Sequence, residues 1–186
     1  MKKNNTNTNA PLFPGSNYYS KTQFAFPIKA VRMNIMATTA LRHNDGITLL
    51  YFKSGTGTLI VNTKEYEIEK GFLVCLGAYH YFQISPSQKN IEVMQCRLSY
   101  DTFLYMAGNP YYHFYELTVN DDPLASRLTG KDLIRTEELL DQLVEVTNKN
   151  SQSFNQQSFL LCMRLMGILQ KTHDLGIWDT TKNYEK

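Results

Sequence analysis

The residues able to support catalysis or metal binding are few in this chain and widely spaced. Cys75, Cys96 and Cys162 each lie in an apolar stretch, and none has the paired spacing of a zinc site. The chain contains no G-x-S-x-G nucleophile elbow, no P-loop and no H-E-x-x-H zinc motif. Asp121 and Asp122 are adjacent, so their side chains point apart in most conformations, as is typical of a turn. These residue types predict no catalytic residue, no metal and no cofactor.

A dense series of short strands between Ile47 and Leu98 would position any binding site. Its β-branched and aromatic runs are separated by turn residues at close intervals, which is typical of antiparallel strands. The turns include Ser54-Gly55-Thr56-Gly57 and Lys70-Gly71, and Asn62-Thr63 predicts a hairpin. Six or seven strands at this spacing predict a closed antiparallel sandwich or barrel.

Apolar residues recur at steps of three and four in the last third of the chain. They predict one helix over residues 131–148 and a second over 154–173, joined by a short polar loop as an antiparallel hairpin. Further apolar residues beside each seam indicate that each helix has more than one partner. We expect the seams to form a homodimer interface through Leu133, Leu140, Leu143, Phe159, Cys162, Met166 and Leu169.

Composition limits the classes of protein to which the chain can belong. With 186 residues, 42% of them hydrophobic, it can form one compact domain. The net charge is +2 and the Lys and Arg residues are scattered, so no basic stripe for nucleic acid is present. The N-terminus lacks the apolar run of a signal peptide, and no apolar run reaches the roughly 20 residues of a membrane span. We expect a cytoplasmic protein with no membrane partner.

The sequence divides into six segments. We expect a disordered polar tail over residues 1–9, an aromatic arm over 10–29, a barrel over 30–99, a short helix and linker over 100–128, the helical hairpin over 129–175 and a tail over 176–186. Two alternatives remain for the arm: it covers one end of the barrel, or it closes over a ligand.

The order of these parts resembles the N-terminal half of arabinose-regulator-like (AraC family) transcription factors. The most specific portion is SGTGTLIVNTKEYEIEKG over residues 54–71, followed by FLVCL over 72–76 and then His80. The resemblance implies a mainly β fold with α: a cupin-like (jelly-roll) antiparallel barrel that binds a small effector, followed by a two-helix hairpin that dimerises. In that family two helix-turn-helix units follow. This chain ends at Lys186, where they would begin, so we expect a sensor domain that reaches DNA only through an absent C-terminal domain.

The sequence departs from the pattern of metal-binding cupins. Such cupins use two histidines and a carboxylate near the first strand, plus a later histidine. Here His43 stands alone, and Thr48 occupies the position where many relatives have Glu. Two alternatives to a sensor remain open: a stand-alone metal-dependent cupin isomerase or dioxygenase, and a barrel filled by its own side chains that only dimerises.

By position, the resemblance implies a ligand site that includes Arg42, from the loop before the first long strand. We expect His80 and Phe82 to share one face of their strand, and Met94 and Cys96 to share one face of the last strand. Three of these side chains offer apolar contact and few hydrogen bonds, so we expect an effector more apolar than a sugar, with one polar or anionic group. The alternative for each residue is core filling, and a one-residue slip would invert every face.

Overall fold

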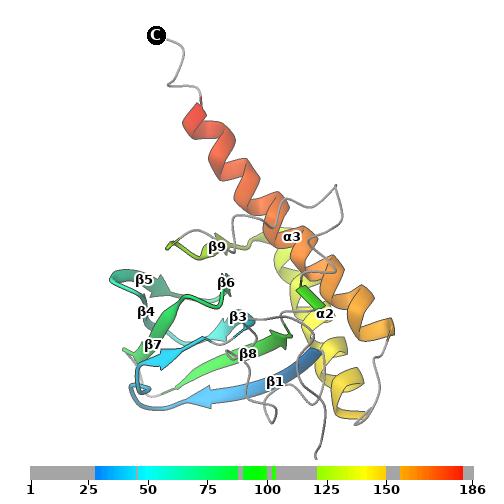
Figure 1. Cartoon of the computed structure of the whole chain (residues 1–186), viewed down its shortest axis with the longest axis horizontal. Coiled ribbons are helices and arrows are strands. Elements are labelled where there is room, and N and C mark those ends of the chain that lie inside the picture. Colours follow the sequence, from blue (N-terminus) through cyan, green and yellow to red (C-terminus); the bar gives the residue numbers. More distant parts are fainter. Residues whose placement is uncertain are drawn as a thin grey trace, which may run out of the picture.

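The computed structural model describes residues 28–44, 46–87, 90–99, 102–103, 121–149 and 156–181, with side chains described as far as Thr172. The strands are β1 (Ile28–Ile35), β2 (Arg42–His43), β3 (Ile47–Ser54), β4 (Gly57–Val61), β5 (Lys64–Ile68), β6 (Phe72–Leu76), β7 (Tyr81–Pro86), β8 (Ile91–Leu98) and β9 (Leu124–Arg127), and the long helices are α2 (Gly130–Lys149) and α3 (Gln156–Thr181) (Figure 1). The predicted tail over 1–9 and most of the segments predicted over 10–29 and 100–128 lie outside the described residues.

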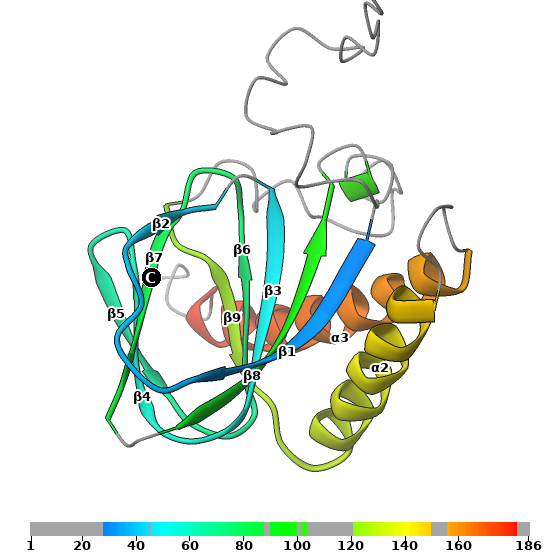
Figure 2. The same ribbon diagram turned by 90° about the horizontal axis from the view of Figure 1, so that it is seen from below.

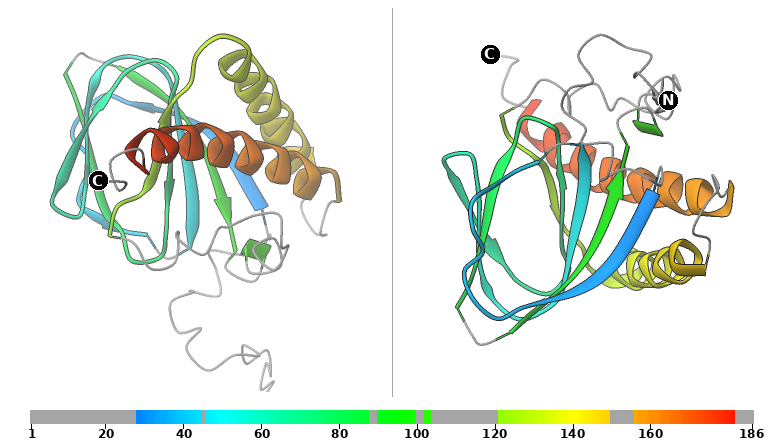
Figure 3. Two further views of the ribbon diagram at one scale, coloured as in Figure 1. Left: turned by 90° about the horizontal axis from the view of Figure 1, so that it is seen from above. Right: turned by 60° about the horizontal axis from the view of Figure 1, so that its bottom comes forward.

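Two antiparallel sheets form the barrel, and both helices cover the same sheet. Sheet A has the strand order β1-β8-β3-β6-β9, and sheet B has the order β2-β7-β4-β5. The helices lie on the outer side of sheet A (Figures 2 and 3). This arrangement confirms the predicted antiparallel barrel followed by a helical hairpin. None of the described helices combines the length and the apolar run that crossing a bilayer requires.

Strand β9 lies inside the segment that we expected to be a linker. Its residues pair with β6 in the register Phe72↔Arg127 to Cys75↔Leu124, so the chain adds an edge strand to sheet A before α2 begins. Gly71 makes this pairing possible. It has φ +86°, a backbone angle that favours glycine. A Cβ at this position would lie 2.7 Å from the carbonyl oxygen of Leu128, which is closer than van der Waals contact allows. The amide of Leu128 donates to Gly71 O at 2.9 Å.

Sheet A is apolar on both faces and therefore separates two hydrophobic cores. The first, the barrel core, lies between the sheets and contains Leu50, Phe52, Leu59, Val61, Ile68, Phe72, Val74, Leu76, Phe82, Ile84, Ile91 and Val93. The second, the helix-facing core, contains alternate residues of the same strands, among them Leu49, Tyr51, Leu73 and Cys75, together with the apolar side chains of α2 and α3. Each helix thus has the additional partner that the width of its apolar surface predicts.

The predicted dimer interface needs correction. Leu140, Leu143, Cys162, Met166 and Leu169 are at most 1% exposed within the single chain, because they pack against each other and against sheet A. Leu133 and Phe159 are partly buried against the same core. A heptad spacing shows which helix face is apolar but does not show what covers that face. Here the outer face of the sheet covers it.

Polar contacts also attach α2 to sheet A. The buried hydroxyl of Tyr51 donates to Glu137 Oε1 at 2.8 Å, and burial followed by this hydrogen bond raises the pKa of the tyrosine. At the free edge of β1, Arg32 forms an ion pair with Asp141 at 2.5 Å. The Thr147 hydroxyl accepts from the amide of Ala30 at 3.2 Å and donates to the Ala30 carbonyl at 3.3 Å. The helix therefore satisfies backbone groups that an edge strand would otherwise leave open.

Candidate functional site

The side chains of β8 that point into the barrel change in character along the strand. Gln95 pairs with Leu50 of the barrel core, and Arg97 pairs with Thr48, which lies on the same face. Ile91 and Val93, on this face near the other end, are completely buried, whereas Gln95 and Arg97 are partly exposed. Because β8 lies between β1 and β3, its inner face can be reached only through the barrel. The inner face of β8 is therefore fully buried at one end of the barrel and partly exposed at the other, which we call the accessible end.

We call the layer of inward positions at the accessible end the mouth. Within each sheet these residues lie directly opposite one another on neighbouring strands, so they form one layer across the barrel. Sheet A contributes Lys29, Arg97, Thr48 and Leu76, and sheet B contributes Arg42, Phe82, Val61 and Lys64. Four of these eight positions are basic and none is acidic, and one of the four, Lys64, is paired with Asp122 outside the layer.

A buried hydrogen-bond network holds the rim of the mouth. The Asn44 amide donates to the carbonyl oxygens of Gly46 at 2.6 Å and of Leu76 and Gly77 at 2.9 Å each, and its oxygen accepts from Thr48 Oγ1 at 2.7 Å. His80 is 1% exposed, and its Nδ1 accepts from the amide of Gly77 at 2.8 Å. This bond assigns the ring proton of neutral His80 to Nε2. The network fixes the loops that join the strands at this end.

The structure brings together three of the five residues that the resemblance implied for the ligand site. Arg42 and Phe82 are register partners in the mouth, and His80 lies at its rim. Met94 and Cys96 do not join them. Both belong to the helix-facing core and are completely buried there, so their predicted placement inside the barrel is wrong. Whether the other three bind a ligand stays a prediction.

The inverted face of β8 has a physical explanation. A strand covered on both sides by protein carries apolar residues on both faces, so the usual assignment of apolar residues to the barrel interior fails. Sequence reasoning consequently missed Gln95 and Arg97, which alternate with Met94 and Cys96. One signal was available. The predicted helices have wide apolar surfaces, and these need an apolar outer sheet face to pack against.

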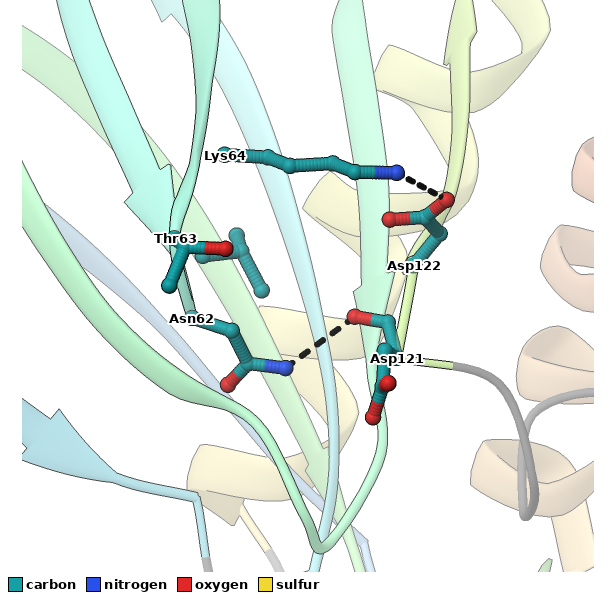
Figure 4. A pocket seen from close by; sticks show the side chains of 6 residues that line it. Asn62, Thr63, Lys64, Asp121 and Asp122 are labelled. Carbon is teal, nitrogen blue, oxygen red and sulfur yellow. Dashed lines mark hydrogen bonds and ion pairs between the residues drawn. The ribbon is translucent and has the colours of Figure 1, made fainter.

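A polar hollow of about 430 Å³ lies where the edges of the two sheets meet, between β5 and the residues that precede β9 (Figure 4). It is lined by Val61, Asn62, Thr63, Lys64, Asp121 and Asp122. Lys64 Nζ donates to Asp122 at 2.5 Å, which raises the pKa of the lysine, and the Asn62 amide donates to Asp121 O at 3.1 Å. Arg127 of β9 forms ion pairs with Glu67 and Glu69 along the same seam. At this seam, side-chain contacts and not backbone hydrogen bonds between strands therefore join the two sheets.

Metal-binding side chains do not gather in the part of the chain that the structure describes. No group of three His, Cys, Asp or Glu residues there has an arrangement able to hold a metal ion. The three cysteines lie instead in the helix-facing core, as free thiols without solvent exposure. Burial, followed by the neighbouring Cys96, raises the pKa of the Cys75 thiol; the pKa of Cys162 is raised first by a hydrogen bond with Cys96 and then by burial. Protonated buried thiols have little nucleophilic reactivity.

Comparison with known proteins finds similarity in structure only. No family model matches the chain, and no curated protein matches it in sequence. Among solved structures, an apo variant of ToxT from Vibrio cholerae aligns with a TM-score of 0.56 at 14% identity, over 81% of this chain and 57% of that one. ToxT bound to (E)-4-(8-methylnaphthalen-1-yl)but-3-enoic acid aligns with a TM-score of 0.53 at 16% identity, over 80% of this chain and 56% of that one.

A third structure, of ToxT at 1.65 Å resolution, aligns with a TM-score of 0.51 at 17% identity, over 81% of this chain and 57% of that one. The chain thus spans a little over half the length of these relatives. At such identities the likeness establishes the fold. That fold is the antiparallel barrel with a helical hairpin which the resemblance stated from the sequence implies.

Proposed function

We propose that this chain is the effector-sensing domain of a bacterial AraC-type transcriptional regulator. In this proposal a small molecule binds in the mouth of the barrel and controls a DNA-binding helix-turn-helix domain that is not part of this chain. The observation that carries the proposal is the partly exposed polar inner face at Gln95 and Arg97, within a fold shared with ToxT. A barrel that served only as a scaffold would bury apolar side chains along the whole of this face.

The lining of the mouth supports a polar or anionic group on the effector. ToxT has been crystallised with an aromatic carboxylic acid, which supports a small-molecule effector here as well. The expectation of an effector more apolar than a sugar rested on Phe82, Met94 and Cys96, and two of these three face the helices. Thr48, Gln95 and Arg97 take their place on the inner face. We therefore keep the expectation that the effector has an anionic group, and we drop the expectation that the rest of the effector is apolar.

The proposal further assigns the chain to the cytoplasm, as a homodimer without catalytic activity. Because the heptad seams are buried within the chain, a second copy would have to use the outer surface of the helices. Ile134 on α2 is 58% exposed and Leu160 on α3 is 55% exposed, so both are available for such a contact. The proposal assigns no catalytic residue. Stoichiometric iron, manganese or zinc in the purified protein would contradict it.

Adjacent residues on opposite faces of β8 provide a matched test of binding. A panel of small organic acids, including the naphthyl butenoic acid bound by ToxT, would be screened by the shift in melting temperature and then by calorimetry. We expect Gln95→Leu to weaken binding of any hit and Met94→Leu to leave it unchanged, because only the first side chain lies on the inner face, directly below the mouth. A hit weakened by Met94→Leu alone, or a panel without any hit, would contradict the proposed site.

A further inference from the structure

Three cysteines meet in the helix-facing core, from both of the layers that form it. Cys75 on β6 and Cys96 on β8 lie on the outer face of sheet A, where each is the register partner of Leu49 on the strand between them. Cys162 belongs to the same core and comes from α3. All three are free thiols and completely buried. The core therefore gathers three oxidisable groups at the contact between the barrel and the helical hairpin.

The three cysteines are not equally placed to form a disulfide. Neighbouring strands lie about 4.8 Å apart, so Cys75 and Cys96, with β3 between them, have Cα atoms roughly 9–10 Å apart. A disulfide requires roughly 4.4–6.8 Å between Cα atoms, which excludes this pair. The thiols of Cys162 and Cys96, in contrast, share a hydrogen bond across the contact between α3 and the sheet. This second pair therefore needs only a local adjustment of its side chains to form a bond.

The surroundings of the Cys96–Cys162 pair favour a disulfide over a metal site. The core around both thiols is made of hydrophobic side chains. Two thiolates that held a monovalent cation would leave a net negative charge among these side chains, and an unpaired buried charge is costly. No group of three His, Cys, Asp or Glu residues in the described ranges could hold a metal ion instead. A disulfide carries no charge and is compatible with an apolar core.

We propose that peroxide converts Cys96 and Cys162 into a disulfide that ties α3 to β8. In the first step one thiol loses its proton and its sulfur attacks a peroxide oxygen; the O–O bond breaks, water leaves and a sulfenic acid forms. In the second step the other sulfur attacks the sulfenic sulfur; the S–S bond forms, the S–O bond breaks and a second water leaves. The two thiols together lose two electrons, and one hydrogen peroxide is reduced to two water molecules.

Burial makes this reaction slow and its product persistent. Peroxide reaches the completely buried sulfur atoms only while α3 is displaced from sheet A, and a protonated thiol reacts slowly. Once formed, the bond closes a long loop of the chain between β8 and α3, which restricts mainly the unfolded state. Oxidation therefore fixes the hairpin on the barrel. We expect the pair to respond to sustained and not to brief exposure.

Peptide mapping tests the bond directly. The folded chain would be incubated with hydrogen peroxide, the remaining thiols alkylated in denaturant, and the disulfide located by mass spectrometry of unreduced peptides. We expect a single intramolecular bond, between Cys96 and Cys162, that dithiothreitol removes. The oxidised chain should melt about 5 °C or more above the reduced chain, because the cross-link stabilises the folded state.

Alanine variants separate the pair from the third cysteine. Cys75→Ala keeps the pair and should form the bond as the unmodified chain does. Cys162→Ala keeps Cys75 and Cys96, which are too far apart, and should form no intramolecular bond. Melting curves of the reduced variants would verify that each is folded, and the mapping of the unmodified chain decides the question if either variant is not.

Three results would overturn the inference. The first is that prolonged peroxide treatment of the folded chain leaves the thiols free or oxidises them to acids without a bond. The second is a bond that includes Cys75. The third is an oxidised chain that melts at or below the temperature of the reduced chain, because the bond would then strain the contact and not fix it. None of these results concerns the mouth, so this inference and the proposed sensor function stand or fall separately.

Discussion

The two faces of sheet A are made from alternate residues of the same strands, yet they differ in how they are covered and in which residues remain exposed to solvent. The outer face is apolar where α2 and α3 pack on it, and the residues of the helix-facing core are buried there. The inner face is apolar and closed at the floor of the barrel but polar and partly exposed at the mouth. The outer face is therefore committed to holding the fold together. Only the end of the inner face is available to a ligand.

The largest effect should come from a charge placed in the helix-facing core. Leu140→Lys would bury an ammonium group at a position that is 1% exposed, among the apolar side chains of that core. We expect the variant to unfold, with a loss of about 4–5 kcal/mol or more in the free energy of unfolding. Circular dichroism and urea denaturation would measure the loss. Leu160→Lys, on the same hairpin but 55% exposed, is the control and should remain folded.

A folded, monomeric Leu140→Lys protein would restore the original dimer assignment. Light scattering of Leu160→Lys addresses the alternative interface, since a monomer in this variant and a dimer in the unmodified chain would place the contact on the outer surface of the hairpin.

The floor and the mouth should respond differently to truncation. Phe52→Ala removes a completely buried ring from the barrel core and should cost about 3–5 kcal/mol in the free energy of unfolding, because the packed neighbours cannot fill the space. Gln95→Ala, one layer nearer the mouth on the same face, should cost less than about 1 kcal/mol, since its side chain is partly exposed. Chemical denaturation measures both. Similar losses at the two positions would mean that the mouth is as tightly packed as the floor.

Sequence alone predicted the order of elements, and the reason lies in local signals. Strand and turn residues between Ile47 and Leu98 have their expected spacing in the structure, and Asn62 adopts the positive φ of 53° that its hairpin turn requires. Helix periodicity likewise gave α2 and α3, although α3 continues to Thr181, beyond the predicted end. Such features depend on neighbours in the chain, which the sequence displays directly.

What the sequence could not provide was the partner of each apolar face. The heptad seam at Leu140 and Leu169 is equally compatible with a second copy and with the chain's own sheet. The face of β8 that carries Cys96 is equally compatible with the barrel interior and with the helix-facing core. Strand β9 was missed for a related reason, because its four residues, Leu124–Arg127, become a strand only through pairing with β6. These choices depend on contacts distant in sequence.

An intermediate effect is expected at alkaline pH, through the titratable groups of the helix-facing core. Burial raises the pKa of Cys75 above its ordinary value of 9.0, so the folded state keeps a proton that the unfolded state releases. Stability is then fully present below about pH 9 and falls as the pH rises further, by up to about 1.4 kcal/mol per pH unit for each such group. Tyr51 acts in the same direction above its ordinary value of 10.0. Urea midpoints measured from pH 7 to 10.5 would show the decline.

Cys75→Ala serves as the comparison for this pH series, because the variant lacks the titrating thiol while the other groups remain. It should start from lower stability and lose less of it between pH 9 and 10.5. Parallel curves for the variant and the unmodified chain would show that the Cys75 thiol does not contribute to the decline.

Effects of opposite sign are expected at two buried threonines of α2 that face the same core. The hydroxyl of Thr147 both accepts from and donates to the backbone of Ala30, so Thr147→Val should cost about 1–3 kcal/mol by leaving those buried groups without partners. The hydroxyl of Thr136 is buried and has no hydrogen-bond partner among the described residues. Thr136→Val should therefore raise the free energy of unfolding, by up to about 1 kcal/mol, because it removes an unsatisfied polar atom and conserves the shape. Chemical denaturation of both variants would measure these changes. If Thr136→Val destabilises the protein as much as Thr147→Val does, the Thr136 hydroxyl has a hydrogen-bond partner of its own. The layer between α2 and the sheet would then be more polar than its apolar residues indicate.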